Sequence, residues 1–584
     1  MVHLKKNDMR KVLLVIFMCN IALSLHSQSF IWGKRGGAAN PINPNGSNRQ
    51  EEVYSIATDN NKNIFALSKV SMSNLNIDGI PKTYYGDTTS LSDVALSSFS
   101  CDGTYRWSKI IGGSNVEYVP TVHTDNAGNV YFVGKFIGCG DNNFPFRIDD
   151  DILISQSPMD CSTIFIVKYD NDGNLLWFRR PLPSTVTSAQ GITNTHSLGF
   201  TVDEQGNSLW LVKLSPGIYA DGAFNVVNEG IYILKYNTNG EPVQIIAPDM
   251  QLDATWFFNI QFYRSQYSGN FYFAAERSSS PGSAVLGGET MNNSFFLSSF
   301  TQSGDFNWVR QNTGQFYVNS FNVYNLAFDE EDNIYLGGRI AGINTTEFMG
   351  FSVSATTTPA FVMKINSSAD TLLWGSASNK GSGMDGGIAI KDGELGLTSS
   401  CYSNNLVWGE QTLYVSETNQ GTDVLLARFN TDTGSCVGLS KISSDVGSSD
   451  IGTALAVDAS GDYLIGGGFE HYLYTDSSQL INTSTQSDFF IVKYASEACS
   501  ELGLSENETD KIVLYPNPVR NTVGIEVPSA QAYSIYNVKG QLLLNGQLTM
   551  GLNLVNIEDI PMDTYILVLE TAQGEKTFHK LIKM

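Results

Sequence analysis

The fold is decided by the stretch TVHTDNAGNVYFVG, residues 121–134, in which a polar turn separates two apolar segments. Asp125 and Asn129 bracket the turn, and Gly128 lies inside it. Asp and Asn side chains bond nearby backbone groups, and Gly supplies the positive φ that a tight turn requires. Apolar residues alternate with others on both sides, which is typical of strands with one buried face. The stretch therefore predicts a β-hairpin over 121–134.

This hairpin pattern recurs along the chain. Copies cover 55–68, 200–212, 326–338 and 455–467, and weaker copies cover 262–274 and 387–399. The clearest copies have turns that begin with Asp59, Asp125, Asp203, Asp329 and Asp458. A recurring unit of this kind indicates a repeat architecture rather than a series of unrelated domains.

A second pattern alternates with the first: an apolar strand, a polar turn with Gly, and then Trp. FIVKYDNDGNLLW, residues 165–177, is the clearest copy. Two further copies, 233–244 and 426–438, keep the strand and the turn but lose the Trp. The Trp residues of this pattern, including one near the N-terminus, are Trp32, Trp107, Trp177, Trp308 and Trp374. We expect them to pack between neighbouring sheets rather than to form a sugar-stacking face.

The two patterns together predict an all-β, seven-bladed β-propeller. Each period of roughly 65 residues holds two hairpins, and a four-stranded sheet buries both faces only when copies stack around an axis. The last copy ends after its third strand, at 489–495, whereas the segment from Trp32 to Gly37 matches the fourth strand at 106–113. We therefore predict that the N-terminal strand completes the last blade and closes the ring.

The alternation of these two patterns over 29–495 resembles the SBBP-type bacterial β-propeller repeats. The resemblance implies an exported protein, and it implies no particular chemistry. Residues 1–27 support export, because a positively charged start precedes an apolar run that is too short to span a membrane. We predict a signal peptide at 1–27, the propeller at 28–499, an acidic linker at 500–511 and a separate C-terminal domain at 512–584.

The C-terminal domain has several short strands with turns and is predicted to be a small Ig-like β-sandwich. It resembles the type A C-terminal sorting domain of the type IX secretion system, known from Bacteroidota. The matching residues are Tyr515, Pro516, Asn517, Pro518, Gly540, Tyr565, Lys580 and Lys583. The resemblance implies that the type IX machinery is a partner and that the protein is secreted or attached to the outer cell surface.

Composition excludes some classes of function. The chain has 35 Lys and Arg against 58 Asp and Glu, a net charge of −23, so nucleic acid is not an expected partner. No transmembrane segment is predicted after the leader. Six cysteines follow the leader, which allows 15 disulfide connectivities. Of these we predict Cys139–Cys161, Cys401–Cys436 and Cys101–Cys499.

The sequence predicts no catalytic residue, no metal site and no cofactor. Asp170 and Asp329 head oxygen-rich turns that resemble calcium loops, but the flanking strands and the missing Glu favour ordinary hairpin turns. The histidines of the mature chain are expected to be structural, and no nucleophile elbow occurs. Specificity is expected from the variable loops at 140–160, 214–228 and 341–358, because propellers carry function on loops at one end.

The sequence leaves three kinds of function open. We expect a secreted or surface-exposed binding or adhesion protein whose partner is an extracellular glycan or protein. The alternative is an extracellular hydrolase or lyase of glycans or peptides at the channel mouth, and a third possibility is a structural component of a surface layer. A cluster of ionisable groups with perturbed pKa at the channel mouth would favour an enzyme, and a polar or aromatic surface without one would favour a binding protein.

Overall fold

The structure is a computed structural model, and the chain divides into two units, Met1–Ala498 and Cys499–Met584, each of which is described by itself. The predicted signal peptide and the predicted linker lie outside the described residues. The structure describes residues 28–38, 51–71, 74–86, 93–113, 117–136, 145–154, 163–183, 195–253, 260–276, 283–314, 321–340, 345–354, 358–381, 386–402, 405–414, 421–445, 447–476, 478–482, 487–499, 513–515, 517–527, 530–571 and 576–584.

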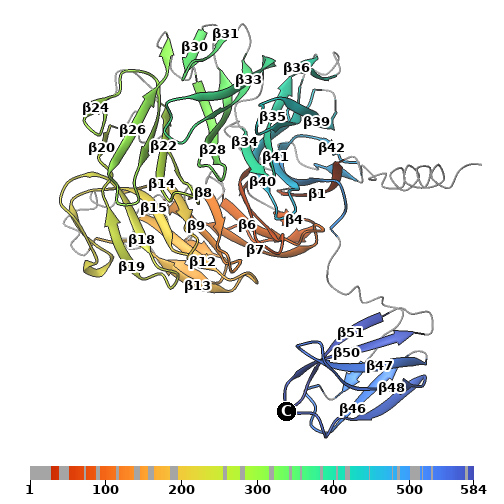
Figure 1. Ribbon diagram of the computed structural model, residues 1–584. Coiled ribbons are helices and arrows are strands. Elements are labelled where there is room, and N and C mark those ends of the chain that lie inside the picture. The colour runs from red at the N-terminus through yellow and green to blue at the C-terminus, as the bar shows by residue number, and fades with distance from the viewer. Residues whose placement is uncertain are drawn as a thin grey trace, which may run out of the picture. The chain divides into compact units, whose positions relative to one another are not determined.

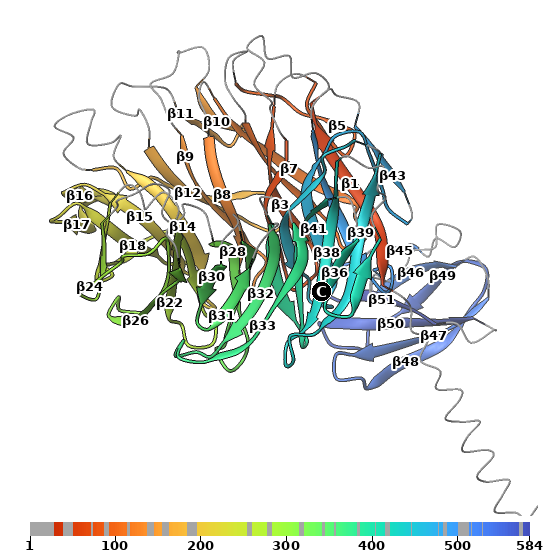
Figure 2. The ribbon, with the colours of Figure 1, turned by 90° about the horizontal axis from the view of Figure 1, so that it is seen from above.

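The first unit is all-β and propeller-like, and one pattern of four antiparallel strands recurs through it (Figures 1 and 2). We number these sheets in chain order. Sheet 1 contains β2 (Val53–Thr58), β3 (Ile64–Val70), β6 (Asp93–Phe99) and β7 (Tyr105–Gly112). Sheet 2 contains β8 (Glu117–Thr124), β9 (Val130–Phe136), β12 (Thr163–Tyr169) and β13 (Leu175–Arg179). Sheet 3 contains β14 (His196–Val202), β15 (Ser208–Leu214), β18 (Gly230–Tyr236) and β19 (Pro242–Ile246).

The remaining sheets of the first unit follow the same order. Sheet 4 contains β21 (Ile260–Arg264), β22 (Phe271–Glu276), β25 (Phe295–Phe300) and β26 (Phe306–Gln311). Sheet 5 contains β28 (Phe321–Phe328), β29 (Ile334–Ile340), β32 (Pro359–Ile365) and β33 (Leu372–Gly381). Sheet 6 contains β34 (Gly387–Lys391), β35 (Glu394–Tyr402), β38 (Thr422–Asn430) and β39 (Cys436–Ser444). Sheet 7 contains β40 (Ile451–Val457), β41 (Tyr463–Phe469), β44 (Asp488–Ala495) and β1 (Ser29–Gly37).

Sheet 7 joins the two ends of this unit. The N-terminal strand β1 pairs antiparallel with β44, so that Phe30 lies opposite Tyr494 and Gly36 opposite Phe489. This is the pairing that the sequence predicts. Neighbouring sheets contact one another in chain order, mostly through their first strands: between sheets 4 and 5 the contact is from β22 to β28, and β40 of sheet 7 contacts β2 of sheet 1. The sheets therefore follow one another in a closed circuit of contacts.

An extra hairpin, which the repeat pattern did not predict, lies between the second and third strands of each sheet. In the clearest cases it pairs with the outer strand of the preceding sheet: β4–β5 with β1, β10–β11 with β7, and β42–β43 with β39. Such pairing covers part of an otherwise open sheet edge. The bounds are β4 (Asn76–Ile77), β5 (Ile80–Pro81), β10 (Phe146–Ile148), β11 (Ile152–Ile154), β42 (Tyr472–Tyr474) and β43 (Gln479–Ile481).

The other insertions form small sheets of their own. Two of them are simple hairpins: β16 (Gly217–Tyr219) with β17 (Phe224–Val226), separated by the 3-10 turn η1 (Ala220–Gly222), and β36 (Leu406–Trp408) with β37 (Gln411–Leu413). The other two add a third strand to the hairpin. β23 (Ala284–Leu286) and β24 (Glu289–Thr290) pair with β20 (Met250–Leu252), and β30 (Thr345–Phe348) and β31 (Phe351–Ser354) pair with β27 (Thr313–Gly314). Among all the inserted hairpins, three fall in the loops that are expected to carry specificity: β10–β11, β16–β17 and β30–β31.

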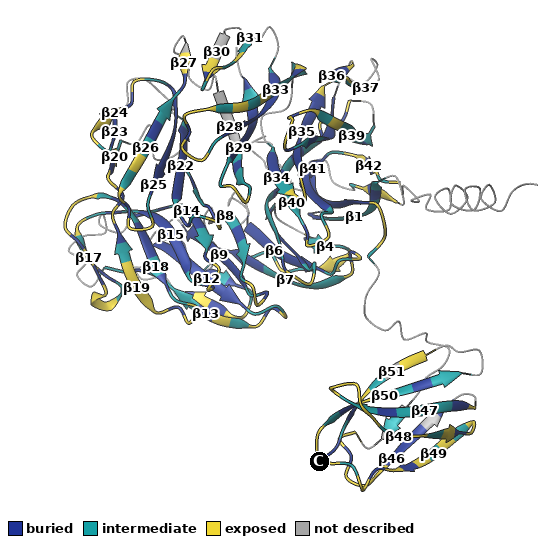
Figure 3. Ribbon diagram, in the orientation of Figure 1, coloured by how far each residue is buried: buried dark blue, intermediate teal, exposed yellow. Residues whose placement is uncertain are grey.

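The core of the first unit lies between the faces of neighbouring sheets. The second and third strands are the most buried, and the third strands β6, β12, β25 and β32 are buried at every residue (Figure 3). Clusters of apolar side chains join adjacent sheets; one, for example, contains Phe65 of sheet 1 and Phe132 of sheet 2. Both faces of the middle strands are thus covered, which explains why those strands read as almost continuous apolar runs.

The repeated Trp residues lie at these boundaries. Trp107 on the outer strand of sheet 1 donates its indole N–H to the carbonyl of Asn171, 2.9 Å away, in the turn of sheet 2. The indole also lies against Gly173, whose φ is +82° and whose substitution by a residue with a Cβ would place that atom 2.7 Å from the ring. The equivalent bonds join Trp32 to Cys101, Trp177 to Thr238 and Trp374 to Thr431.

The second unit has two antiparallel sheets that share one apolar core. Val523 and Ile525 from one sheet pack in the same cluster as Ile535 and Leu567 from the other. One sheet contains β45 (Val513–Tyr515), β46 (Thr522–Val527) and β49 (Gly551–Asn556). The other contains β48 (Leu542–Leu548), β47 (Gln531–Asn537), β50 (Thr564–Thr571) and β51 (Lys576–Ile582).

Candidate functional site

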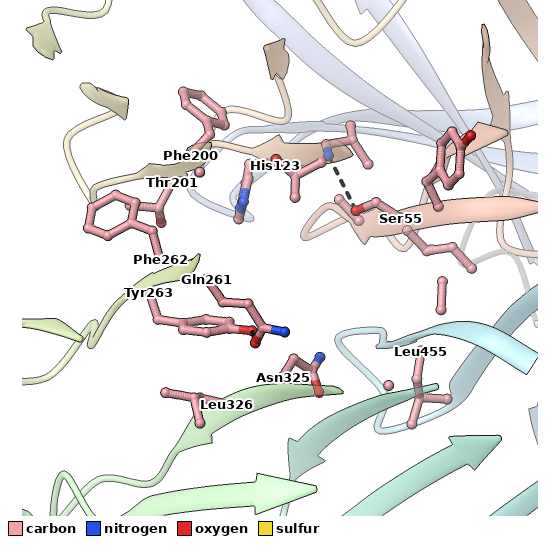
Figure 4. A pocket seen from close by; sticks show the side chains of 18 of the residues that line it. Ser55, His123, Phe200, Thr201, Gln261, Phe262, Tyr263, Asn325, Leu326 and Leu455 are labelled. Carbon is pink, nitrogen blue, oxygen red and sulfur yellow. Dashed lines mark hydrogen bonds between the residues drawn. The ribbon is translucent and has the colours of Figure 1, made fainter. Parts of the chain in front are cut away.

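The innermost strands of the first unit surround a cavity of about 640 Å³ (Figure 4). Residues of β2, β8, β14, β21, β28 and β40 line it, together with Gly386 and Gly387 at the start of β34, so that every one of the numbered sheets contributes. These strands reach the centre because each is the first strand of its sheet. A volume of this size lies within the range of roughly 300–1,000 Å³ that is usual for small-molecule sites.

The lining of this central cavity is aromatic and polar. Phe200 of β14 and Tyr263 of β21 supply rings, and Gln261 of β21 accepts a hydrogen bond of 2.7 Å from the Tyr263 hydroxyl. Asn325 of β28 joins sheets 5 and 6, because its side chain donates to the Ile388 carbonyl and accepts from the Ile388 N–H. Such a lining presents both hydrogen-bond donors and acceptors beside apolar ring faces.

His123 is the titratable ring of the central cavity. It packs edge-on against Phe200, with ring centres 5.4 Å apart. Burial lowers the pKa of His123 to about 4, and a hydrogen bond to the Phe200 backbone offsets only part of that shift. The imidazole is therefore neutral at physiological pH, as expected of a structural histidine.

Charge is scarce at this cavity. Among the described residues that line it there is no Asp and no Glu. Arg264 lies at its edge, and both of its terminal nitrogens bond the Glu204 carboxylate at 2.6 and 3.0 Å. Hydrolysis of a glycosidic bond ordinarily requires two carboxyl groups flanking the substrate. The described lining lacks that pair.

Carboxyl groups with strongly raised pKa values lie instead at the sheet ends where the loops are. Burial, and then the charge of Asp488, raise the pKa of Glu51 to about 8. Burial also raises the pKa values of Asp93, Asp450 and Asp488 to about 7. Glu51 and Asp488 are each only 1% exposed, so a substrate has no access to them in this structure.

Glu51 and Asp488 hold the two ends of the first unit together. Glu51 accepts hydrogen bonds from the backbone N–H groups of Ser71 and Ala38, and Asp488 accepts one of 2.6 Å from Arg35 of β1. A Cβ at Gly37 would collide with both carboxyl groups. A Cβ at Gly112 would likewise collide with the Asp93 carboxyl group. These collisions explain why both fourth strands, β1 and β7, end in glycine.

The repeated Asp residues are structural. Asp125 Oδ1 accepts hydrogen bonds from the N–H groups of Ala127 and Asn129 in its own turn, at 3.0 and 2.9 Å. Asp59 also accepts a bond of 2.6 Å from Asn171 of the next sheet. In four sheets a Lys of the third strand is paired with the turn Asp: Lys168–Asp125, Lys235–Asp203, Lys364–Asp329 and Lys493–Asp458.

The carboxylates that begin the oxygen-rich turns already have partners in the protein. The Asp170 side chain accepts the N–H groups of Asp172 and Asn174 and the side-chain amide of Asn174. Asp329 does the same with Asn333 and is also paired with Lys364. No group of three His, Cys, Asp or Glu residues suited to a metal occurs in the described part of the chain.

The cysteine predictions have mixed outcomes. Cys101 and Cys499 are each disulfide-bonded. Cys401 and Cys436 are both free thiols, so the predicted bond between them is wrong. They lie on opposite sides of β38, where Cys401 is opposite Asp423 and Cys436 opposite Phe429, six residues further along. A disulfide needs Cα atoms within about 7 Å. Cys139 and Cys161 lie outside the described residues.

Three of the predicted sorting residues, Asn517, Tyr565 and Gly540, take part in the fold of the second unit. Asn517 accepts a bond from Ile582 N–H and donates one of 2.7 Å to the Lys580 carbonyl. Tyr565 is buried, and Gly540 has a φ of +81° in the turn after β47. Pro516 lies outside the described residues, and nothing is described of the Tyr515 side chain. Pro518 is exposed.

The two lysines of the predicted sorting motif, Lys583 and Lys580, lie in different surroundings. The Lys583 side chain is buried, and its ammonium donates to the carbonyls of Ile557, Glu558 and Ile560 at 2.5–2.7 Å. Lys580, by contrast, is exposed. An ammonium that bonds three carbonyl oxygens ties the last strand to the loop after β49.

Residues 513–584 match the family model described as a secretion system C-terminal sorting domain. Among curated proteins, an uncharacterised WD repeat-containing protein of Acanthamoeba polyphaga mimivirus is 24% identical over 185 residues, which is 30% of this chain and only 12% of that protein.

Two solved structures are similar over most of the chain. A quinohemoprotein alcohol dehydrogenase from Comamonas testosteroni is 9% identical, with a TM-score of 0.31 and coverage of 85% of this chain and 80% of that one. A protein of unknown function from Dyadobacter fermentans is also 9% identical, with a TM-score of 0.33 and coverage of 79% and 98%. At such identities and scores the likeness says nothing about activity.

The fold and the tail together define the class of protein. It is a propeller-like all-β protein with a type IX sorting domain at its C-terminal end. The sorting domain makes the type IX secretion machinery its partner and identifies it as a secreted or outer-surface protein. Within the described residues, no helix is long and apolar enough to cross a membrane.

Proposed function

We propose that this is a binding or adhesion protein of the cell exterior whose ligand is an extracellular glycan or protein. Residues 1–27 would be removed as a signal peptide. Residues 28–499 would form a seven-bladed propeller of the SBBP type, and an acidic linker at 500–511 would lead to the Ig-like sorting domain at 512–584. We further propose that Cys101 and Cys499 form one disulfide.

The observation that carries this proposal is the lining of the central cavity. It combines Phe200 and Tyr263 rings with the Gln261 amide and a neutral His123, and its described residues include no carboxylate. Aromatic faces beside amides suit recognition, because they supply contact area and hydrogen bonds without reactive charge. An enzyme would instead need ionisable groups within reach of the substrate.

The experiment uses purified residues 28–499 on a panel of polysaccharides and glycoproteins, with retention and product masses measured together. Binding without a change in ligand mass is expected, and Gln261→Ala should weaken it about tenfold or more, because a hydrogen-bonding amide would be lost from the cavity. Gln411→Ala, on β37 away from the cavity, is the matched control. New product masses would contradict the proposal and favour the hydrolase or lyase.

A further inference from the structure

The outer strand of sheet 3 lacks the Trp that most of its counterparts carry. In sheets 1, 2 and 5 the strand register places Trp107 opposite Ser98, Trp177 opposite Lys168, and Trp374 opposite Lys364. In sheet 3 the same register places Gln244 opposite Lys235. Gln244 is exposed, so the boundary between sheets 3 and 4 is built differently from those that hold an indole.

A second cavity, of about 570 Å³, lies at this boundary. It is lined by Gln244 and Lys235 of sheet 3 and by residues of sheet 4 that include Asn270. Ile246, two residues beyond Gln244, contacts Gly304, the turn glycine of sheet 4, and does so with an aliphatic group instead of an indole. The aliphatic group occupies less volume than an indole, so part of the boundary between sheets 3 and 4 stays open.

Loss of the Trp alone does not create such an opening. Sheet 6 also lacks it, and the register there places Gly438 opposite Arg428. The Arg428 guanidinium fills that space: a Cβ on Gly438 would lie 2.5 Å from it, and its central carbon lies 5.4 Å from the centre of the Tyr494 ring. At the sheet 3 boundary the corresponding residue, Lys235, is turned instead to Asp203, at 3.3 Å.

The charges at the sheet 3–sheet 4 cavity are neutralised in pairs. Lys235 is paired with Asp203, and Arg264 is held by both oxygens of Glu204. A charged ligand would therefore have to compete with an existing partner for either cation. Each pair leaves no net charge to attract an ion, so the site favours a ligand without charge.

The remaining lining suits a molecule with many hydroxyl groups. Gln205, Gln244 and Asn270 each carry an amide, which offers donors and an acceptor together. Buried Ile246 and Phe271 supply an apolar surface beside them. We propose that the cavity between sheets 3 and 4, opened by Gln244 in the place of Trp, binds a neutral carbohydrate.

The test uses the full chain and four neutral hexasaccharides, those of the α-1,4- and β-1,4-glucans, β-1,3-glucan and β-1,4-xylan, in titration calorimetry. At least one should bind with a Kd below about 1 mM. Gln244→Trp restores the indole found in sheets 1, 2 and 5 and should abolish that binding. Val243→Trp is the matched control: it adds the same side chain at a neighbouring residue of β19 that is 55% exposed and does not line the cavity, and it should leave binding unchanged.

Gln205→Ala provides a second variant should Gln244→Trp not fold, and it should weaken binding at least fivefold. Binding of none of the four sugars, or binding that survives both the Gln244 and the Gln205 changes, would overturn the proposal. So would stronger binding of an acidic hexasaccharide such as hexagalacturonate. Because Gln244 and Gln205 line this cavity and not the central one, a negative result here leaves the proposed function to its own test with Gln261→Ala.

Discussion

At the scale of single residues, one glycine in the turn between the third and fourth strands serves two purposes. Gly173 adopts a φ of +82° and also leaves room for the Trp107 ring above it. Gly103, Gly240 and Gly434 do the same beneath Trp32, Trp177 and Trp374. The repeated Gly of one sheet and the repeated Trp of the preceding sheet therefore form a single packing contact between the two sheets.

Alanine substitution separates the two roles of this glycine. Gly79 has a φ of +80° with nothing within 4 Å of the added methyl, so Gly79→Ala should cost only the left-handed backbone penalty of about 1 kcal/mol. Gly173→Ala should cost about 1–3 kcal/mol more, because the methyl meets the indole. Denaturant unfolding of residues 28–499 measures both, and equal losses would contradict a packing role.

The buried carboxyl groups predict an unusual dependence of stability on pH. The folded pKa of Glu51 is about 8, and those of Asp93, Asp450 and Asp488 are about 7, all above their unfolded values. The folded state therefore binds more protons, and stability should fall as pH rises from about 4 to 8.

Glu51→Gln should reduce that slope, and at pH 8 it should raise the free energy of unfolding by at least about 1 kcal/mol, since no buried charge then forms. The measurement is denaturant unfolding at several pH values, with Glu497→Gln on the exposed surface as control. A slope unchanged by Glu51→Gln would show that other groups set the pH dependence.

At the scale of elements, the repeat pattern predicts the hairpins and the pairing of β1 with β44, because turn residues and alternation are local signals. The inserted hairpins could not be predicted in the same way. Strands such as Asn76–Ile77 and Ile80–Pro81 are too short to establish a periodicity, and their partner is an outer strand distant in sequence. The Cys401–Cys436 prediction fails for a related reason, since strand register decides the distance and sequence spacing does not reveal it.

The candidate cavities could not be predicted from local sequence patterns either. The missing Trp of sheet 3 is visible in the sequence, but whether a neighbour fills the gap depends on side-chain packing. Arg428 fills it in sheet 6, whereas Lys235 turns to Asp203 in sheet 3. The central cavity likewise gathers side chains from strands that no motif links, such as Phe200 and Asn325.

The N-terminal strand is an element whose removal can be tested. Without residues 28–37, β44 presents an open edge, and such edges favour aggregation. We expect the truncated chain, residues 38–499, to be less soluble and to unfold at a lower denaturant concentration than residues 28–499. Added peptide 28–38 should bind and restore stability, as measured by unfolding in its presence.

A peptide with Trp32→Ala should bind more weakly, because it loses the bond to the Cys101 carbonyl and the packing on Gly103. A scrambled peptide serves as the negative control. Unfolding of the truncated chain at the same denaturant concentration as the intact one would contradict a stabilising role for β1.

At the scale of the whole molecule, the chain consists of two units with separate cores. We therefore expect residues 28–499 to melt at the same temperature alone as in residues 28–584, within about 2 °C. Residues 512–584 should likewise unfold cooperatively by themselves. Calorimetry of the three proteins makes the comparison, and a large drop in the melting temperature of 28–499 would indicate that the tail stabilises it.

The partner of β1 has a consequence for how the protein is made. Phe30 is among the first described residues, yet it is aligned with Tyr494 near the end of the first unit. A chain that grows from its N-terminus must therefore hold this strand unpaired until almost the whole unit has been synthesised. Contacts so distant in sequence form slowly. We therefore expect a nascent chain of this kind to stay unfolded for longer, and a truncated translation product that lacks β44 would leave β1 without its partner.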